Sequence, residues 1–135
     1  MPPTILLIED DPLWEDAIVQ TLEAEGYVVE VARTAADGRE MLGLGGESSG
    51  QCEYGLLIVD VRLPANHEGL QLVARLREVQ DQNHVPLDEQ PRVIVSTVLN
   101  HVAVSEWKDR SRWHVFLVKP YKLDELVESV ASLLQ

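Results

Sequence analysis

Residues 54–69 read YGLLIVDVRLPANHEG, and this stretch decides the fold. It surrounds one charged residue, Asp60, with five apolar ones: Leu56, Leu57, Ile58, Val59 and Val61. An apolar run of this length, bounded by turn-forming residues, is typical of a strand that is buried on both faces of a parallel sheet. Asp60 then lies at the mouth of the sheet, which is where open α/β sheets bind ligands.

The composition limits the class of protein. The chain has 135 residues, of which 45% are hydrophobic, and this suits a single domain over residues 1–135. Acidic residues outnumber basic ones by 23 to 11, so the formal charge is −12. A body this acidic repels a phosphate backbone, and we expect a neutral or basic protein partner rather than direct binding to nucleic acid.

The sequence shows no pattern typical of a signal peptide, a disulfide-bonded framework or a membrane-spanning segment. The single cysteine, Cys52, excludes an internal disulfide and favours a reducing compartment. No signal peptide is recognisable, and no apolar stretch approaches the ~20 residues of a membrane span. We therefore expect a cytoplasmic domain that makes no membrane contact.

Apolar strands alternate five times with helices along the chain. The strands are predicted at residues 4–8, 27–31, 54–60, 92–95 and 113–118. A helix follows each strand, and the five helices begin near Pro12, Ala35, Leu70, Asn100 and Leu123. The alternation predicts an α/β fold with a single doubly wound five-stranded parallel sheet and five helices, arranged as a three-layer sandwich.

Local signals define the first two helices. Asp11 before Pro12 predicts an N-cap, and Gly26 predicts the end of the same helix. Thr34 is the predicted N-cap of the second helix, which runs into a flexible Gly- and Ser-rich loop at residues 43–50. The apolar stripe of the first helix is expected to comprise Leu13, Ala17, Ile18 and Leu22.

The third helix and the segment after it are expected to expose their polar residues. An apolar stripe that includes Val73 and Leu76 should face the core, with Arg75 and Arg77 directed outward. The polar segment at residues 81–90, which contains a proline, is predicted to be a long surface connection.

Polar side chains stand at the ends of four predicted strands. Glu9 and Asp10 follow the first strand and Asp60 ends the third, while the last two strands end in Ser96–Thr97 and Lys119. In a parallel sheet these ends share one edge. If the first, third, fourth and fifth strands are neighbours, we expect these groups to converge on one site.

This set of groups suits phosphoryl transfer. Three neighbouring carboxylates repel one another, and a hard divalent cation such as Mg²⁺ resolves the conflict because it binds oxygen ligands. A lysine and a hydroxyl would complete the coordination of an anion with several oxygens. Phosphoryl transfer requires such positioning and charge neutralisation, and a carboxylate can itself be the nucleophile and form an acyl phosphate.

The sequence resembles the receiver domain of two-component response regulators over nearly its whole length. The matching segments are ILLIEDDP (5–12), EGYVVEVARTAADGREML (25–42), YGLLIVDVRLP (54–64), PRVIVST (91–97) and FLVKPY (116–121). The resemblance implies a flavodoxin-like sheet with the strand order 2-1-3-4-5. It also implies a signalling switch in a phosphorelay and not an enzyme that turns over a substrate.

The resemblance assigns roles around a metal ion. Asp60 resembles the phosphoacceptor, which takes a phosphoryl group from a phosphohistidine on a sensor histidine kinase or a phosphotransfer protein. Asp10 resembles the carboxylate that ligates Mg²⁺ (or Mn²⁺) directly, and Glu9 its neighbour that acts through water. The backbone carbonyl of Arg62 would complete the metal ligands.

The resemblance also assigns a switch. Lys119 would pair with the phosphoryl oxygens, and Ser96, or its neighbour Thr97, would donate a hydroxyl to them. Phe116 occupies the position of the family's rotating aromatic residue, which is commonly tyrosine. These movements would reshape the face made by the fourth helix, fifth strand and fifth helix, to which an output domain or protein binds. A phosphorylation-dependent dimer is a further expectation.

Three other classes compete with this interpretation. A pseudo-receiver would act as a protein-interaction module without phosphate, and the loop at residues 64–69, one residue longer than is usual, keeps that interpretation open. A haloacid-dehalogenase-like phosphatase would place its Asp-x-Asp motif after the first strand, whereas Asp60 is on the third. A flavin-binding flavodoxin-like module would need a phosphate loop where this chain has Glu9–Asp11.

Overall fold

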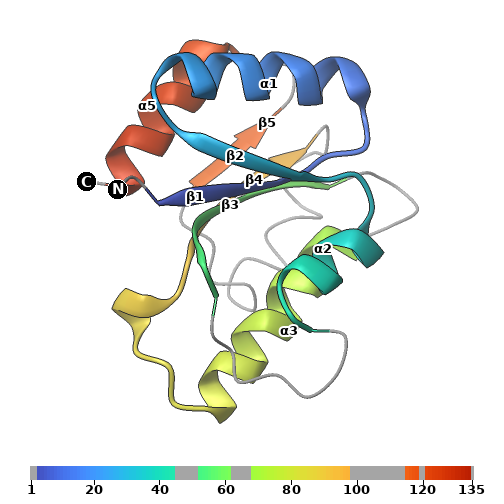
Figure 1. The fold of residues 1–135 in the computed structure, drawn as a ribbon, viewed down its shortest axis with the longest axis vertical. Coiled ribbons are helices and arrows are strands. Elements are labelled where there is room, and N and C mark those ends of the chain that lie inside the picture. Colours follow the sequence, from blue (N-terminus) through green and yellow to red (C-terminus); the bar gives the residue numbers. More distant parts are fainter. Residues whose placement is uncertain (1–2, 45–51, 62–67, 98–114, 119–120, 135) are drawn as a thin grey trace.

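The computed structural model describes residues 3–44, 52–61, 68–97, 115–118 and 121–134 (Figure 1). Its parallel strands form one sheet: β1 (Thr4–Ile8), β2 (Val28–Ala32), β3 (Tyr54–Val61), β4 (Arg92–Thr97) and β5 (Val115–Val118). The strand order is β2-β1-β3-β4-β5, which is the order that the family resemblance implied. The central position of β3 explains why its sequence is an almost unbroken apolar run.

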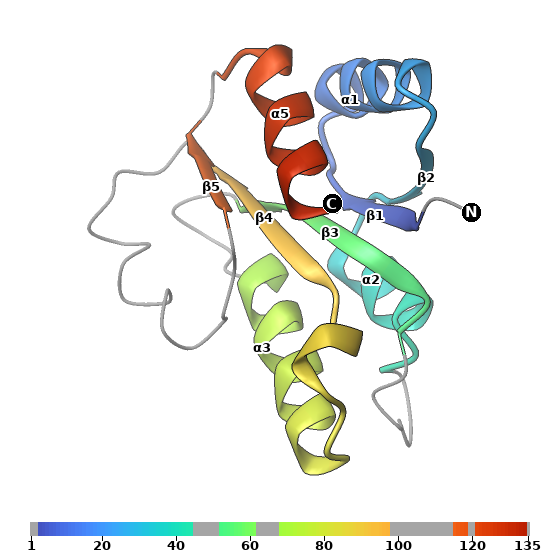
Figure 2. The same ribbon diagram turned by 90° about the vertical axis from the view of Figure 1, so that its left-hand side faces the viewer.

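Helices cover both faces of the sheet. In Figure 1 and Figure 2, α1 (Pro12–Ala24) and α5 (Leu123–Leu133) lie side by side on one face, while α2 (Ala35–Met41) and α3 (Glu68–Gln82) lie on the other. A short 3₁₀ helix (Leu87–Glu89) precedes β4. The predicted fourth helix, at residues 100–110, falls outside the described residues. None of the described helices is long and apolar enough to cross a membrane.

Two apolar clusters, one on each face of the sheet, form the core. Successive residues of β3 alternate between them, because side chains of a strand point to opposite faces. Leu57 and Val59 belong to the cluster against α2 and α3, while Leu56 and Ile58 belong to the cluster against α1 and α5. All four side chains are fully buried, as the sequence predicted.

The predicted N-caps of α1 and α2 and the predicted end of α1 are confirmed, whereas α3 begins at Glu68, two residues before the predicted start at Leu70. Asp11 Oδ1 accepts a hydrogen bond of 3.0 Å from the backbone N–H of Leu13, and Pro12 is the first residue of α1. Thr34 Oγ1 accepts a 3.0 Å bond from the N–H of Asp37 at the start of α2. After α1, Gly26 has a φ of 92°, a left-handed conformation that glycine adopts at no steric cost.

The structure corrects the predicted face of α1. Leu13 was expected in the core, but it is 81% exposed. At 100° per residue, Leu13 lies roughly 140° around the helix from Ile18, whereas Trp14 lies only about 40° away. Trp14 accordingly packs against the cluster that contains Ile18 and Leu22.

The structure also corrects the predicted exposure of α3 and the segment after it. Arg77 was expected to point outward, but it is 3% exposed. It follows the buried Val73 by four residues, and residues with this spacing share a face of the helix. The segment at residues 81–90 was predicted to be a surface connection, but its first two residues belong to α3, which extends to Gln82. The last residue of the segment, Gln90, is buried.

Candidate functional site

Three carboxylates meet at one edge of the sheet. Glu9, Asp10 and Asp60 each offer an oxygen, and these oxygens all lie within 4.8 Å of one another. Glu9 is 2% exposed, Asp60 is half-buried and Asp10 is exposed. The cluster therefore reaches from the protein interior to the surface, where a ligand can approach it.

The backbone fixes the positions of the three carboxylates. Ile8 is in register with Val59 of β3, so the residues that follow Ile8 lie beside Asp60. The N–H of Glu9 donates a 3.0 Å hydrogen bond to the carbonyl of Ala32 and extends the parallel ladder by one residue. Asp11 is engaged as the N-cap of α1 and is not part of the cluster.

A serine with a buried hydroxyl is the register partner of Asp60 on the neighbouring strand. Ser96 of β4 is in register with Asp60 and is 2% exposed. Its Oγ has no hydrogen-bond partner among the residues that the structure describes. Since a buried polar group without a partner is costly, this hydroxyl is suited to a ligand that brings an acceptor oxygen to Asp60.

The other predicted site residues are only partly covered. Thr97 is in register with Val61, and Phe116 with Val95, but the side chains of Thr97 and Phe116 are outside the described set. Arg62 and Lys119 fall outside the described residues altogether. The structure therefore brings together Glu9, Asp10, Asp60 and the backbone of Ser96.

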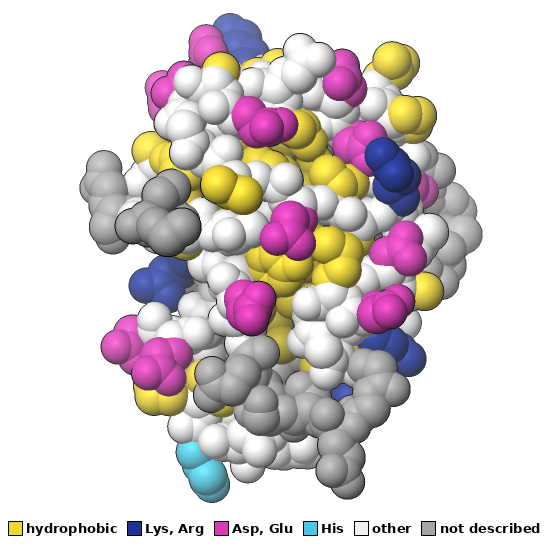
Figure 3. Space-filling view, viewed as in Figure 1, with side chains coloured by type: hydrophobic (Ala, Val, Ile, Leu, Met, Phe, Trp, Pro, Cys, Tyr) yellow, Lys and Arg dark blue, Asp and Glu magenta, His cyan; other side chains and the backbone are white. Residues whose placement is uncertain are grey.

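The donor set of the cluster fits a hard divalent cation. Carboxylate oxygens are preferred ligands of Mg²⁺, which is commonly held by one or two carboxylates together with water and phosphate oxygens. Taking the Glu9 carboxylate out of water beside two other carboxylates is unfavourable unless positive charge compensates for it. Acidic side chains are also frequent elsewhere on the surface: Figure 3 shows more Asp and Glu than Lys and Arg side chains on the face that carries α1 and β2.

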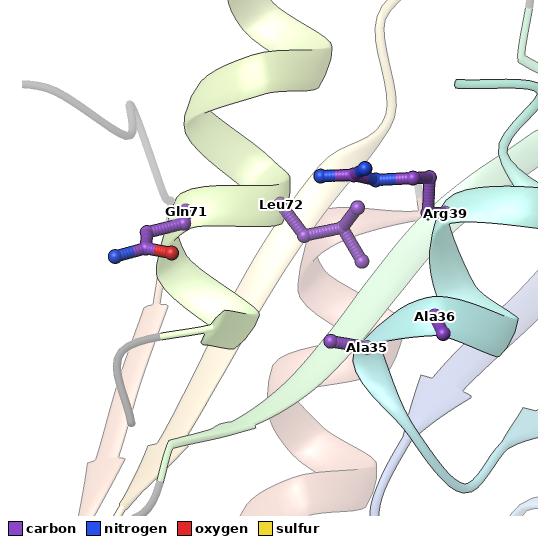
Figure 4. A pocket seen from close by; sticks show the side chains of 5 residues that line it. All are labelled: Ala35, Ala36, Arg39, Gln71 and Leu72. Atoms are coloured by element: carbon purple, nitrogen blue, oxygen red, sulfur yellow. The ribbon is translucent and has the colours of Figure 1, made fainter. Parts of the chain in front are cut away.

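A separate hollow lies between α2 and α3. Its cavity has a volume of about 390 Å³ and is lined by Ala35, Ala36, Arg39, Gln71 and Leu72. In Figure 4, Arg39 extends from α2 toward Leu72 on α3, while Gln71 points away from both. None of the three clustered carboxylates is among its described lining residues. The predicted chemistry is thus concentrated at the edge of the sheet and not in this hollow.

Comparison with known proteins gives one consistent family. A family model described as response regulator receiver domain matches residues 5–131. The transcriptional regulatory protein PcoR of Escherichia coli is 33% identical over 131 residues, covering 97% of this chain and 51% of PcoR. This chain spans about half the length of PcoR, and about a quarter to a half of the other curated relatives that it matches.

Solved structures agree with the family model. A CheY-like receiver domain protein from Methanospirillum hungatei JF-1 is 25% identical, with a TM-score of 0.76 over 99% of this chain and 94% of that one. The response regulator TrrA of Thermotoga maritima, solved in complex with Mg²⁺ and BeF, shares the fold at 23% identity, with a TM-score of 0.70 over 98% of this chain and 99% of its own. The chain therefore belongs to the family of response regulator receiver domains.

Proposed function

We propose that the chain is a phosphorylatable switch of a two-component phosphorelay, in which Asp60 accepts a phosphoryl group from a phosphohistidine. The observation that carries the proposal is the meeting of Asp60 with Glu9 and Asp10, while Ser96, whose hydroxyl is buried, is in register with Asp60 on the neighbouring strand. Receiver domains as a family act as phosphorylation-dependent switches, and membership of that family supports the same role here.

Asp60 is the proposed nucleophile. One of its carboxylate oxygens attacks the phosphorus, and a P–O bond forms as the P–N bond to the donor histidine breaks. The imidazole then leaves and takes up a proton. Mg²⁺ or Mn²⁺, when bound, neutralises charge on the carboxylates and the phosphoryl oxygens. Asp10 would ligate the ion directly, Glu9 would act through water, and Arg62 would contribute a backbone carbonyl.

The remaining residues respond to the phosphoryl group on Asp60. Lys119 pairs with a phosphoryl oxygen, and Ser96 donates its buried hydroxyl to another, with Thr97 as the alternative donor. Movement of Ser96 gives Phe116 room to turn inward. A partner that prefers the resulting face of residues 100–110, β5 and α5 shifts the equilibrium toward it.

The proposed partners follow from this role. The phosphoryl donor is a sensor histidine kinase or a phosphotransfer protein, which places the domain in the cytoplasm. The recipient of the signal is an output domain or protein. The curated relatives, which include transcriptional regulators, are about twice as long as this chain or longer, and their additional length leaves room for such a domain. Phosphorylation-dependent dimerisation is one form that the output can take. The whole chain, residues 1–135, is proposed to act as one receiver domain without enzymatic turnover.

The test is the mass of the intact protein after incubation with acetyl phosphate and Mg²⁺. We expect one added phosphoryl group, which is lost when Mg²⁺ is chelated and in Asp60→Asn. Asp88→Asn, which changes an exposed carboxylate near the opposite edge of the sheet, is the matched control and should label normally. If neither phosphate nor beryllium fluoride binds, the domain is an interaction module that works without phosphate.

A further inference from the structure

An ion pair joins the first turn of α1 to the residue that follows β2. Nε of Arg33 lies 2.7 Å from Oε1 of Glu15, and Nη2 of Arg33 donates a 3.5 Å hydrogen bond to Oε2 of the same carboxylate. The side chain of Glu15 is only 14% exposed, whereas that of Arg33 is 72% exposed. The carboxylate is therefore largely withdrawn from water, and its cationic partner lies at the surface.

The backbone on each side of the ion pair is fixed. The N–H of Glu15 donates a 2.9 Å hydrogen bond to the carbonyl of Asp11, which precedes α1. Arg33 stands between Ala32, the last residue of β2, and Thr34, the N-cap of α2. In Figure 1, the start of α1 and the end of β2 lie at the same edge of the sheet. The ion pair thus links two defined points at the edge that carries the carboxylate cluster.

These contacts close a bonded ring around the acidic segment that follows β1. The segment begins at Glu9, whose N–H donates a 3.0 Å hydrogen bond to the carbonyl of Ala32. It ends at Asp11, whose carbonyl accepts the bond from Glu15. The ion pair closes the ring, because its guanidinium belongs to the residue directly after Ala32. Asp10 is the middle residue of the segment, so the ring holds its backbone from both sides.

We propose that Arg33 and Glu15 are positioning residues, which act through this bonded ring on Asp10 and so set the Mg²⁺ affinity of the carboxylate cluster. The inference rests on the proposed function, in which Asp10 would ligate the ion directly. A carboxylate oxygen of Asp10 lies within 4.8 Å of one on Asp60, and a shift of the Asp10 backbone changes this separation. Groups that orient metal ligands commonly contribute to metal affinity.

The ion pair can be broken without unfolding α1. Ile18 and Leu22 anchor the body of the helix, since both side chains are buried in the core. An ion pair with one largely exposed member contributes little to global stability. The consequence of breaking it should therefore be local, in the first turn of α1 and in the acidic segment that leads into it.

The direction of the change in metal affinity separates positioning from a simple charge effect. Removing the positive charge of Arg33 near a cation site should by itself strengthen Mg²⁺ binding. If the bonded ring positions Asp10, Arg33→Ala should weaken binding instead. We expect binding about threefold to fivefold weaker. This loss is smaller than the roughly 10- to 100-fold loss found for partners bonded directly to a ligand, because the ring acts through the backbone.

Calorimetric titration of the whole chain with Mg²⁺, at fixed ionic strength, measures this affinity. Arg33→Lys restores a cation that can pair with Glu15, although without the planar fork, and it should bind Mg²⁺ more tightly than Arg33→Ala. Adding Glu15→Gln to Arg33→Ala should weaken binding by less than about twofold more, since both changes break the same pair. Arg75→Ala is the matched control, because it removes an arginine from an exposed ion pair on α3, and its Mg²⁺ affinity should equal that of the wild type.

Amide hydrogen exchange in the metal-free protein gives a second readout. In Arg33→Ala the Glu15 amide, which is bonded to the carbonyl of Asp11, should exchange at least about threefold faster. The Leu22 amide, in the part of α1 that is anchored in the core, should exchange at the wild-type rate. Local loosening changes the first amide only, whereas general destabilisation accelerates both.

The outcomes are distinct. Mg²⁺ binding that is unchanged or tighter in Arg33→Ala overturns the positioning role while leaving Asp60 as the phosphoacceptor. An equal loss in Arg75→Ala, or equally faster exchange at Leu22, assigns the effect to net charge or stability and also overturns it. If the wild-type protein binds Mg²⁺ but takes up no phosphate, the proposed function fails, and the variant affinities still decide this inference. If it binds no Mg²⁺, both fail.

Discussion

Nη2 of Arg77 donates a hydrogen bond of 2.7 Å to the carbonyl oxygen of Pro91 and thereby ties α3 to the start of β4. Nη1 of the same side chain lies 3.3 Å from the amide oxygens of both Gln80 and Gln90. Gln90 in turn donates a 2.9 Å bond to the carbonyl of Val85. The buried guanidinium thus organises the connection between the helix and the strand that carries Ser96.

Truncating Arg77 should destabilise the domain strongly. Arg77→Ala removes the donor of three acceptors in a buried environment, and we expect a loss of about 2–4 kcal/mol in the free energy of unfolding. Arg75→Ala is the matched control on the same helix, because its 3.1 Å ion pair with Glu78 is exposed and should contribute less than about 1 kcal/mol. Urea denaturation of both variants measures the difference, and similar losses would contradict a structural role for the buried network.

Arg77 shows how residue type can mislead a prediction of burial. Arginine is usually exposed, so a prediction from sequence assigns Arg77 to the surface. The helical spacing indicates the opposite, because Arg77 lies four residues after the buried Val73. Leu13 is the opposite case, since an apolar residue in the first turn is expected in the core although its angle around α1 points it to solvent. In both cases the position around the helix axis decides burial, and what the helix packs against cannot be inferred from residue type.

The strand-end site is more predictable than the helix faces. The alternation of strands and helices predicts a parallel sheet, and in such a sheet the residues after β1 and at the end of β3 share an edge. The rule predicts that Glu9, Asp10 and Asp60 meet only once β1 and β3 are taken as neighbours, and that strand order was implied by the family resemblance and is the one observed. The Arg33–Glu15 ion pair was not predicted, because it joins segments that are distant in sequence and depends on how α1 packs beside β2.

The stability of the domain at high pH should depend on Tyr54. Its hydroxyl donates a 2.9 Å hydrogen bond to Glu30 Oε1, and burial, together with this carboxylate, raises the pKa of Tyr54 to about 12. In the unfolded chain a tyrosine releases its proton near pH 10. Between about pH 10 and pH 12 the unfolded state therefore holds fewer protons, and the contribution of Tyr54 falls by about 1.4 kcal/mol per pH unit.

Tyr54→Phe should lack this alkaline dependence. Below about pH 10 the wild-type protein should be the more stable of the two, and the gap should close as the pH rises toward 12. Denaturation series at several pH values measure the gap. Glu30→Gln retains a hydrogen-bond acceptor without the charge, and it should narrow the pH range over which the contribution of Tyr54 to stability falls. A gap that stays constant up to pH 12 would mean that the hydroxyl ionises equally in both states.

The contribution of the Asp11 N-cap to stability should be independent of metal binding. Asp11→Ala removes the acceptor of the Leu13 N–H and should cost about 1 kcal/mol of unfolding free energy. Asp11→Ser supplies a hydroxyl in place of the carboxylate and should recover most of that loss. Calorimetric titration should give Asp11→Ser the Mg²⁺ affinity of the wild type, and a large loss of affinity would instead make Asp11 a ligand.

Removing one carboxylate of the cluster should have opposite effects with and without metal. Without a cation, Glu9, Asp10 and Asp60 repel one another across less than 4.8 Å. Asp10→Asn relieves part of this repulsion and should raise the free energy of unfolding by roughly 0.5–1 kcal/mol, a small gain because Asp10 is exposed. With Mg²⁺ at tenfold its dissociation constant, the wild-type protein should gain about 1.4 kcal/mol from binding, and the variant should gain nothing.

Thermal unfolding in chelator and in Mg²⁺ tests both halves of this prediction. Glu23→Gln, an exposed position on α1, changes the net charge by the same amount away from the cluster and is the matched control. It should keep the full Mg²⁺-dependent rise in melting temperature. If Asp10→Asn also keeps that rise, Asp10 does not ligate the cation, and the remaining carboxylates, Glu9 and Asp60, must bind it with other oxygens of the site.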